Sequence, residues 1–169
     1  MRSLTFAVLA IVLFGCSQRN ASDQLSPQNV VGLAPGSKEP RFVFVALDGF
    51  EWNNEHRLWY NKSAKASVTL DHESRKSFQA VVDDFVADRM LAANLELISK
   101  DIRDMNGRPT LLVHGNRMNS KKPEQFCTVA YGTKTGCAQI TAIYPSDMTE
   151  DLKGAIEESL LTSQYEAAD

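Results

Sequence analysis

The chain has 169 residues, of which 43% are hydrophobic, and it carries a formal net charge of −3 at pH 7. A mildly acidic chain does not offer the basic face that nucleic-acid binding requires, nor a polybasic grip on anionic lipid. Its length suits one domain that buries a core without structural metals or several disulfides.

The first sixteen residues have the pattern of an export signal. Arg2 supplies one positive charge, residues 4–14 form an almost unbroken apolar run, and Gly15 precedes Cys16. The run is too short to remain as a membrane-spanning helix, so it predicts a secretory signal. Residues 13–16 resemble the lipobox of bacterial lipoproteins, in which the signal is cut before a cysteine that carries the lipid. The resemblance implies lipid attachment at Cys16, and the alternative is an ordinary signal peptide with a cysteine nearby.

Cleavage before Cys16 would remove the signal, residues 1–15, and leave a net charge of −4, because Arg2 is the only charged residue lost. Residues 16–38 are interpreted as the lipidated N-terminus and a flexible spacer, because they are rich in Ser, Gln, Asn, Pro and Gly. The residue directly after Cys16 is Ser17. Asp at that position retains many Gram-negative lipoproteins in the inner membrane. The resemblance therefore implies an outer-membrane protein facing the periplasm, unless the organism uses other sorting rules. No later apolar run reaches transmembrane length, so the lipid is the expected anchor.

The folded domain is expected at residues 39–165, and its first half combines short strands with one helix. Apolar residues recur with the spacing of one helical face from Phe78 onward, which predicts a single amphipathic helix that ends near Ala93, with Ser74 as its N-cap. Alternating and β-branched segments before it predict strands. These strands are expected at residues 42–47, 50–52, 57–60 and 66–70.

The second half of the domain has a stronger strand pattern. The pair Asn106-Gly107 predicts a tight hairpin, because both residues tolerate a positive φ. A last helix is expected to begin at Asp147, which forms a capping box with Glu150, and the tail after Ser163 is expected to fray. Four strands are expected before this helix, at residues 95–102, 110–115, 125–131 and 137–144.

This order of elements predicts an α+β fold, with a mostly antiparallel sheet of about six strands and two main amphipathic helices packed on it. Three stretches resemble the DcrB-like lipoproteins and the wider PsbP-like fold. They are the Asp-Gly-Phe of residues 48–50 followed by Trp52, the hairpin at residues 106–114, and residues 143–145 before the last helix. The resemblance covers residues 42–163 and implies an α/β/α sandwich that serves as a small, non-enzymatic binding or assembly module.

Cys127 and Cys137 depart from that pattern. An oxidising compartment favours a disulfide between them. However, a tight hairpin that turns at residues 132–136 would place both on one face but four residues apart, roughly 13 Å at the rise of a strand. A disulfide needs Cα atoms about 4.4–6.8 Å apart. A disulfide in a wider hairpin and two free, buried thiols therefore both remain open.

The histidines predict no catalytic or metal site. His72 lies between Asp71 and Glu73, which could hold a metal weakly, but a strand would place His72 on one face and the two carboxylates on the other. His114 lies in an apolar strand and is expected to be a satisfied core or edge histidine, and His56 lies in a polar turn. No nucleophile elbow, phosphate loop or zinc motif is present in the sequence, so no catalytic residue, metal or cofactor is expected.

Trp59 and Tyr60 are the candidate partner surface. They are adjacent in an expected strand, so one faces the core and the other faces solvent. We therefore expect a lipid-anchored, periplasm-facing module that binds another envelope or secreted protein without catalysis, such as an accessory or immunity-type lipoprotein. The alternative is a periplasmic lipoprotein that binds a small molecule or a metal in a pocket between sheet and helix.

Overall fold

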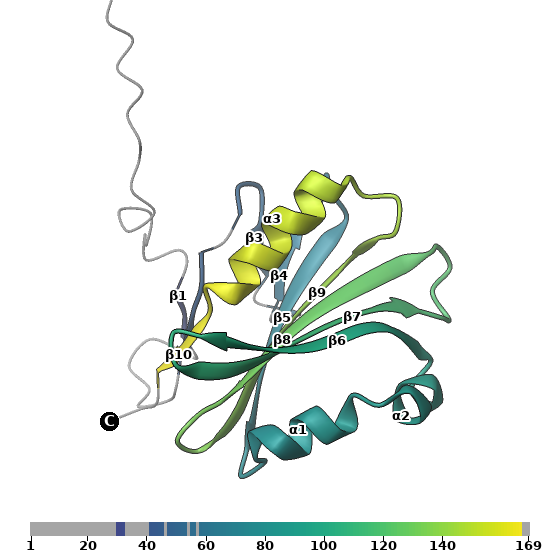
Figure 1. Cartoon of the computed structure of the whole chain (residues 1–169). Helices are drawn as coiled ribbons and strands as arrows, with labels where there is room; N and C mark the ends of the chain where they lie inside the picture. Colours follow the sequence, from purple (N-terminus) through teal and green to yellow (C-terminus); the bar gives the residue numbers. More distant parts are fainter. Residues whose placement is uncertain (1–29, 33–40, 46, 54, 57, 167–169) are drawn as a thin grey trace, which may run out of the picture.

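The computed structural model describes residues 30–32, 41–45, 47–53, 55–56 and 58–166 (Figure 1). The expected signal at residues 1–15, the expected lipid site Cys16 and most of the expected spacer lie outside these residues. Among the helices in the described ranges, none has the length and apolar character needed to cross a membrane.

Seven strands form the main sheet, in the order β3-β4-β5-β9-β8-β7-β6, and every pairing is antiparallel. The predicted hairpin at Asn106-Gly107 is confirmed: it joins β6 to β7 with φ values of 58° and 78°. The strands are β3 (Glu51–Asn53), β4 (Leu58–Asn61), β5 (Ala66–Ser74), β6 (Leu95–Met105), β7 (Arg108–Arg117), β8 (Glu124–Gly132) and β9 (Gly136–Pro145).

A second, three-stranded sheet was not predicted. It contains β1 (Val30–Gly32), β2 (Arg41–Val43) and β10 (Gln164–Glu166), with β2 in the centre. The expectation of a spacer that reaches residue 38 was wrong for β1, and the expectation of a frayed tail was wrong for β10. Within the described residues, β1 and β10 each pair with β2. A strand of three residues is too short to show a hydrophobic period in the sequence.

Three helices are described: α1 (Phe78–Asp84), α2 (Ala87–Ala92) and α3 (Glu150–Leu161). The single helix predicted from Phe78 is broken, because Val86 is extended (φ −118°, ψ 150°). The N-cap is Ser77, whose side chain accepts from the Ala80 amide, and not the predicted Ser74, which ends β5. The predicted capping box was also wrong: α3 begins at Glu150 after Thr149, which makes no side-chain cap bond.

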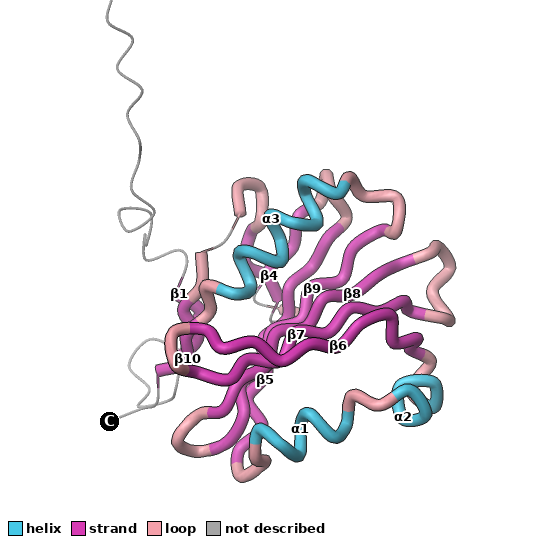
Figure 2. Tube along the Cα trace, in the orientation of Figure 1, coloured by secondary structure: helices cyan, strands magenta, loops and turns pink. Residues whose placement is uncertain are grey.

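The helices cover opposite faces of the sheet, as Figures 1 and 2 show: α3 packs on one face, and α1 and α2 pack on the other. Strand alternation divides the core accordingly. In β7, Leu112 joins the cluster under α3, while Leu111 and Val113 join the cluster under α1 and α2. The predicted α+β sandwich with helices on both faces is therefore confirmed. On the face that α3 covers, Phe42 of β2 and Phe44 join the same core cluster.

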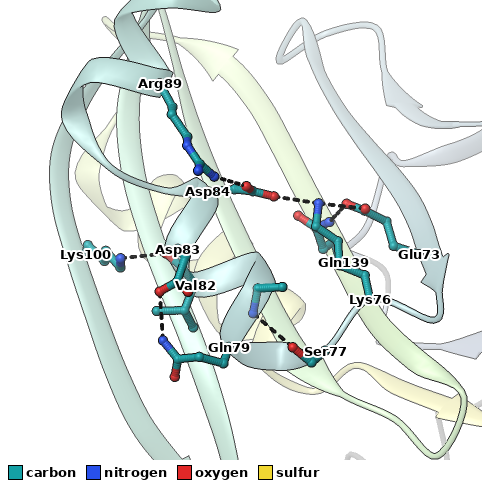
Figure 3. A network of polar contacts seen from close by, with 11 residues as sticks. Glu73, Lys76, Ser77, Gln79, Val82, Asp83, Asp84, Arg89, Lys100 and Gln139 are labelled. Carbon is teal, nitrogen blue, oxygen red and sulfur yellow. Dashed lines mark hydrogen bonds and ion pairs between the residues drawn. The ribbon is translucent and has the colours of Figure 1, made fainter.

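A polar network fixes the break between α1 and α2 (Figure 3). Lys76 Nζ lies 2.7 Å from Glu73 Oε2 and 2.5 Å from Asp84 Oδ2. The other oxygen of Asp84 binds Arg89 in α2, and Lys100 Nζ donates to the Val82 carbonyl oxygen over 2.7 Å. These contacts hold the ends of both helices against β5 and β6.

Candidate functional site

The predicted aromatic pair divides as strand alternation requires. Trp59 is 4% exposed and packs edge-on against Phe44, with ring centroids 5.7 Å apart, whereas Tyr60 is 40% exposed. Trp59 belongs to the core and has no surface to offer a partner. Tyr60 remains available on the solvent side of β4.

Cys127 and Cys137 are both free and buried. Cys137 pairs with Gly132, and Cys127 pairs with Ala142. The predicted register, with Cys137 opposite Tyr131, was wrong by one residue, so the two thiols lie on opposite faces of the sheet and do not form a disulfide. Burial raises the pKa of Cys127 to about 12 and that of Cys137 to about 11, because a thiolate is poorly solvated in an apolar core.

His72 and His56 each make hydrogen-bonding contacts with other residues of the chain. His72 lies in β5 between Asp71 and Glu73 and takes no part in a cluster with them: its Nε2 lies 3.1 Å from Thr133 Oγ1, and its ring stacks on Tyr165 with centroids 4.1 Å apart. Burial lowers the pKa of His72, and the charge of Asp71 opposes that effect. His56 lies in an exposed turn, where its amide donates to Asn53 Oδ1.

An open cleft of about 360 Å³ lies between α3 and the ends of strands β6 to β9. Its volume falls within the range of small-ligand sites, about 300–1,000 Å³. Its rim includes Ile98, the extra residue of a β-bulge between Leu97 and Ser99. The α3 side presents Glu150, Lys153, Gly154 and Glu157, which follow one another on one face of the helix,.

His114 lies in the wall of this cleft and links three elements. Its Nε2 lies 3.0 Å from Glu157 Oε2 on α3, and its Nδ1 lies 3.1 Å from Ser99 Oγ on β6. Arg103 Nη1 lies 3.5 Å from the other oxygen of Glu157. The prediction that His114 is a hydrogen-bonded histidine in the sheet agrees with this geometry, although its partner Glu157 was not predicted.

Cys127 completes a cluster with His114 and Glu157. His114 and Cys127 are directly opposite each other in the pairing of β7 with β8. One ligand atom from each of the three side chains lies within 4.8 Å of the other two. The sequence contains a weak signal for the pair His114 and Cys127, because each lies in an expected strand whose alternation can place it on the face under α3. It contains no signal for Glu157.

Gly115 gives this wall its shape. A Cβ atom at Gly115 would lie 2.3 Å from the Glu96 carbonyl oxygen and 2.4 Å from the Phe126 ring. Only glycine therefore allows Phe126 to pack against β7 in the core cluster under α1 and α2, on the face opposite the His114 side chain. Gly154 differs, because a Cβ atom there would meet nothing within 4 Å, so the helix side of the cleft has open space.

The chain is similar in structure to cyanobacterial PsbP (CyanoP) from Synechocystis sp. PCC 6803, whose structure was determined in solution. The TM-score is 0.53 and the sequence identity is 10%, over 81% of this chain and 92% of that chain. No family model and no curated protein matches the chain in sequence. At this identity the likeness concerns the fold alone, and the fold of this chain is PsbP-like.

Proposed function

We propose that the chain is a lipid-anchored, periplasm-facing protein-binding module of the bacterial envelope, without enzymatic activity of its own. The lipobox-like residues 13–16 support the anchor at Cys16, and Ser17, in place of Asp directly after it, supports an outer-membrane location. The resemblance to DcrB-like lipoproteins supports a binding or assembly module, and the expected tether, the single small domain and the lack of a catalytic motif in the sequence support an accessory or immunity-type role. The structural observation that carries the binding role is the edge strand β6.

β6 has eleven residues and ends the main sheet, with β7 as its one neighbouring strand in the described part of the chain. Ile98 is 55% exposed and Ile102 is 50% exposed. An edge strand with free backbone groups is a template for a strand from another protein. The exposed isoleucines give such a partner apolar side chains to cover.

Charge and shape restrict which partner can use this edge. Lys100, Asp101, Arg103 and Asp104 alternate in sign along β6, and the bulge at Ile98 interrupts the regular ladder. Both features discourage unselective pairing of edges. A partner strand with complementary charges would pair with the alternating charges of β6. The edge therefore favours a specific protein over self-association.

The test is capture of a partner by the acylated protein, purified from membranes, with Ile98 and Ile102 both replaced by Lys. We expect the unmodified chain to retain one stoichiometric envelope or secreted protein and the double variant to lose it. Met118→Lys is the matched control, because Met118 is also an exposed apolar residue (55%) but lies outside β6. Tyr60→Lys tests the second predicted contact.

Absence of any partner above background would contradict the proposal, and so would capture that neither the β6 variant nor Tyr60→Lys reduces. Cys16→Ser adds a separate test of the anchor. That variant is expected to leave the membrane fraction, and its retention there would contradict lipid attachment at Cys16.

A second candidate function is binding of a small molecule or metal, which the cleft beside His114 favours. A ligand that binds only the folded protein raises its melting temperature, so thermal shifts with panels of metals and lipids test this function. Gly154→Leu adds a side chain on the helix side of the cleft, where its Cβ would meet nothing within 4 Å. We expect this variant to abolish the shift for an organic ligand while the protein itself stays folded.

A further inference from the structure

We propose that His114, Cys127 and Glu157 form a site for a divalent transition metal, with zinc as the ion that fits best. The inference rests on the second candidate function, for which it names the ligand, and it is independent of partner binding at β6. The three residues come from β7, β8 and α3, so only the folded chain brings them together.

The geometry of the three donors is close to that of an occupied site. Their ligand atoms already lie within 4.8 Å of one another. Zinc holds nitrogen, sulfur and oxygen ligands at about 2.0–2.3 Å, which places tetrahedral ligand atoms roughly 3.3–3.8 Å apart. Small side-chain rotations are therefore sufficient, and His114 and Cys127 are neighbours across the strand pair.

The chemistry of the three donor groups favours zinc over other divalent cations. Imidazole, thiolate and carboxylate are the three protein ligands of zinc, whereas magnesium and calcium prefer oxygen atoms alone. Three protein ligands leave a fourth position. His114 and Glu157 line the cleft, which gives water or an external ligand access to that position. This arrangement differs from a closed structural zinc site, where the protein supplies all four ligands.

The neighbours of the cluster are those that a metal ligand needs. Ser99 Oγ is 3.1 Å from His114 Nδ1 and fixes the ring so that Nε2 faces Glu157. A partner at the second ring nitrogen orients a metal-bound histidine. Because a hydroxyl can donate or accept, Ser99 fits both the metal-free and the metal-bound tautomer.

Metal binding rearranges protons in a balanced way. The thiol proton of Cys127 leaves to solvent as the sulfur binds the cation. When His114 is neutral with its proton on Nε2, this proton is lost and Nδ1 takes one up, which then points to Ser99 Oγ. The hydrogen bond between Nε2 and Glu157 is replaced by bonds from both atoms to the metal.

Cobalt(II) is the probe, because a thiolate ligand gives Co²⁺ a charge-transfer absorption that nitrogen and oxygen ligands do not. Every protein in the experiment carries Cys16→Ser, which leaves Cys127 and Cys137 as the thiols of the chain. We expect the reduced, metal-free protein to develop this absorption with Co²⁺ and to lose it when one equivalent of Zn²⁺ is added.

The matched variants are Cys127→Ser and Cys137→Ser, since both thiols are buried but lie on opposite faces of the sheet. The first is expected to lose the absorption and the second to retain it. His114→Gln and Glu157→Gln are expected to bind Zn²⁺ at least roughly tenfold more weakly, as loss of a ligand requires. They keep the test decisive if Cys127→Ser does not fold.

Three results would overturn the site. One is a folded chain that shows no thiolate absorption with Co²⁺. Another is an absorption that survives in Cys127→Ser, and the third is a zinc affinity that His114→Gln and Glu157→Gln leave unchanged. A metal-induced thermal shift that persists in Cys127→Ser, His114→Gln and Glu157→Gln would show that the metal binds elsewhere. The second candidate function would then still be supported. None of these results bears on capture of a protein by β6.

Discussion

The Nε2 atom of His114 lies 3.0 Å from a carboxylate oxygen of Glu157, although 43 residues separate the two in the sequence. This contact joins the centre of the sheet to α3 directly above a buried thiol. Both side chains are partly exposed, at 29% and 28%. The pair therefore connects the cleft to the core.

Glu157→Gln is expected to lower the free energy of unfolding by roughly 1 kcal/mol, the usual contribution of a hydrogen bond of this kind. Partial exposure of both side chains keeps the value modest. Urea unfolding in the presence of a chelator measures it, and a double-mutant cycle with His114→Gln isolates the pair. A coupling energy of zero would show that the contact does not contribute to stability.

The two buried thiols are expected to be unreactive in the folded protein. Burial raises the pKa of both Cys127 and Cys137, so the nucleophilic thiolate is scarce,. A colorimetric thiol reagent added to the Cys16→Ser chain should react with both thiols in urea and with neither in native buffer. Rapid labelling of one thiol in native buffer would contradict the structure around that residue.

Two glycine substitutions should act in opposite directions. Gly115→Ala is expected to cost about 1–3 kcal/mol, because its Cβ would overlap the Glu96 backbone and the Phe126 ring,. Gly154→Ala is expected to raise the free energy of unfolding by about 1 kcal/mol, because the residue is helical and its Cβ would meet nothing within 4 Å,. Chemical unfolding checks both, and equal effects would contradict the packing described.

Acid should weaken the network at the junction of α1 and α2. The hydrogen bond from Lys76, together with the charges of Lys76 and Arg89, lowers the pKa of Asp84 against the opposing effect of desolvation. A carboxylate with a lowered folded-state pKa stabilises the protein above its unfolded pKa, about 3.9, and loses that contribution as the pH falls through the folded value.

Asp84→Asn is therefore expected to be less stable than the unmodified chain at pH 7, with the difference vanishing in strong acid. The loss should stay below about 1 kcal/mol, because Asp84 is 40% exposed and solvent screens its ion pairs,. Thermal unfolding from pH 2 to pH 7 provides the measurement, and Glu55→Gln in an exposed turn is the control. A difference that persists unchanged at pH 2 would contradict this assignment.

Local patterns predicted the main sheet because its longer strands are alternating or continuously apolar segments,. The turn at Asn106-Gly107 is determined by two residues that tolerate positive φ, and both adopt it. The break at Val86 escaped prediction because the apolar spacing continues through it. A continuous helix would place Phe85 and Val86 on one apolar face. Instead, Phe85 is partly buried against the core under α1 and α2, while Val86 is 40% exposed.

The cluster beside the cleft escaped prediction for a different reason. His114 and Cys127 meet only in the correct strand register, and an error of one residue moves a side chain to the other face. An error of this kind affected the predicted pairing of β8 with β9, and therefore the faces assigned to Cys127 and Cys137. Glu157 is contributed by a helix whose position over the sheet depends on the whole core, which no local pattern encodes.

Photo-crosslinking in intact cells, with a benzophenone amino acid at Ile102 on β6, would detect a partner at this edge directly. We expect one discrete adduct with an envelope or secreted protein, found in the membrane fraction, and no adduct from the same probe at Met118. A β6 probe that yields no adduct, or one that yields the same products as the probe at Met118, would contradict a specific partner at this edge.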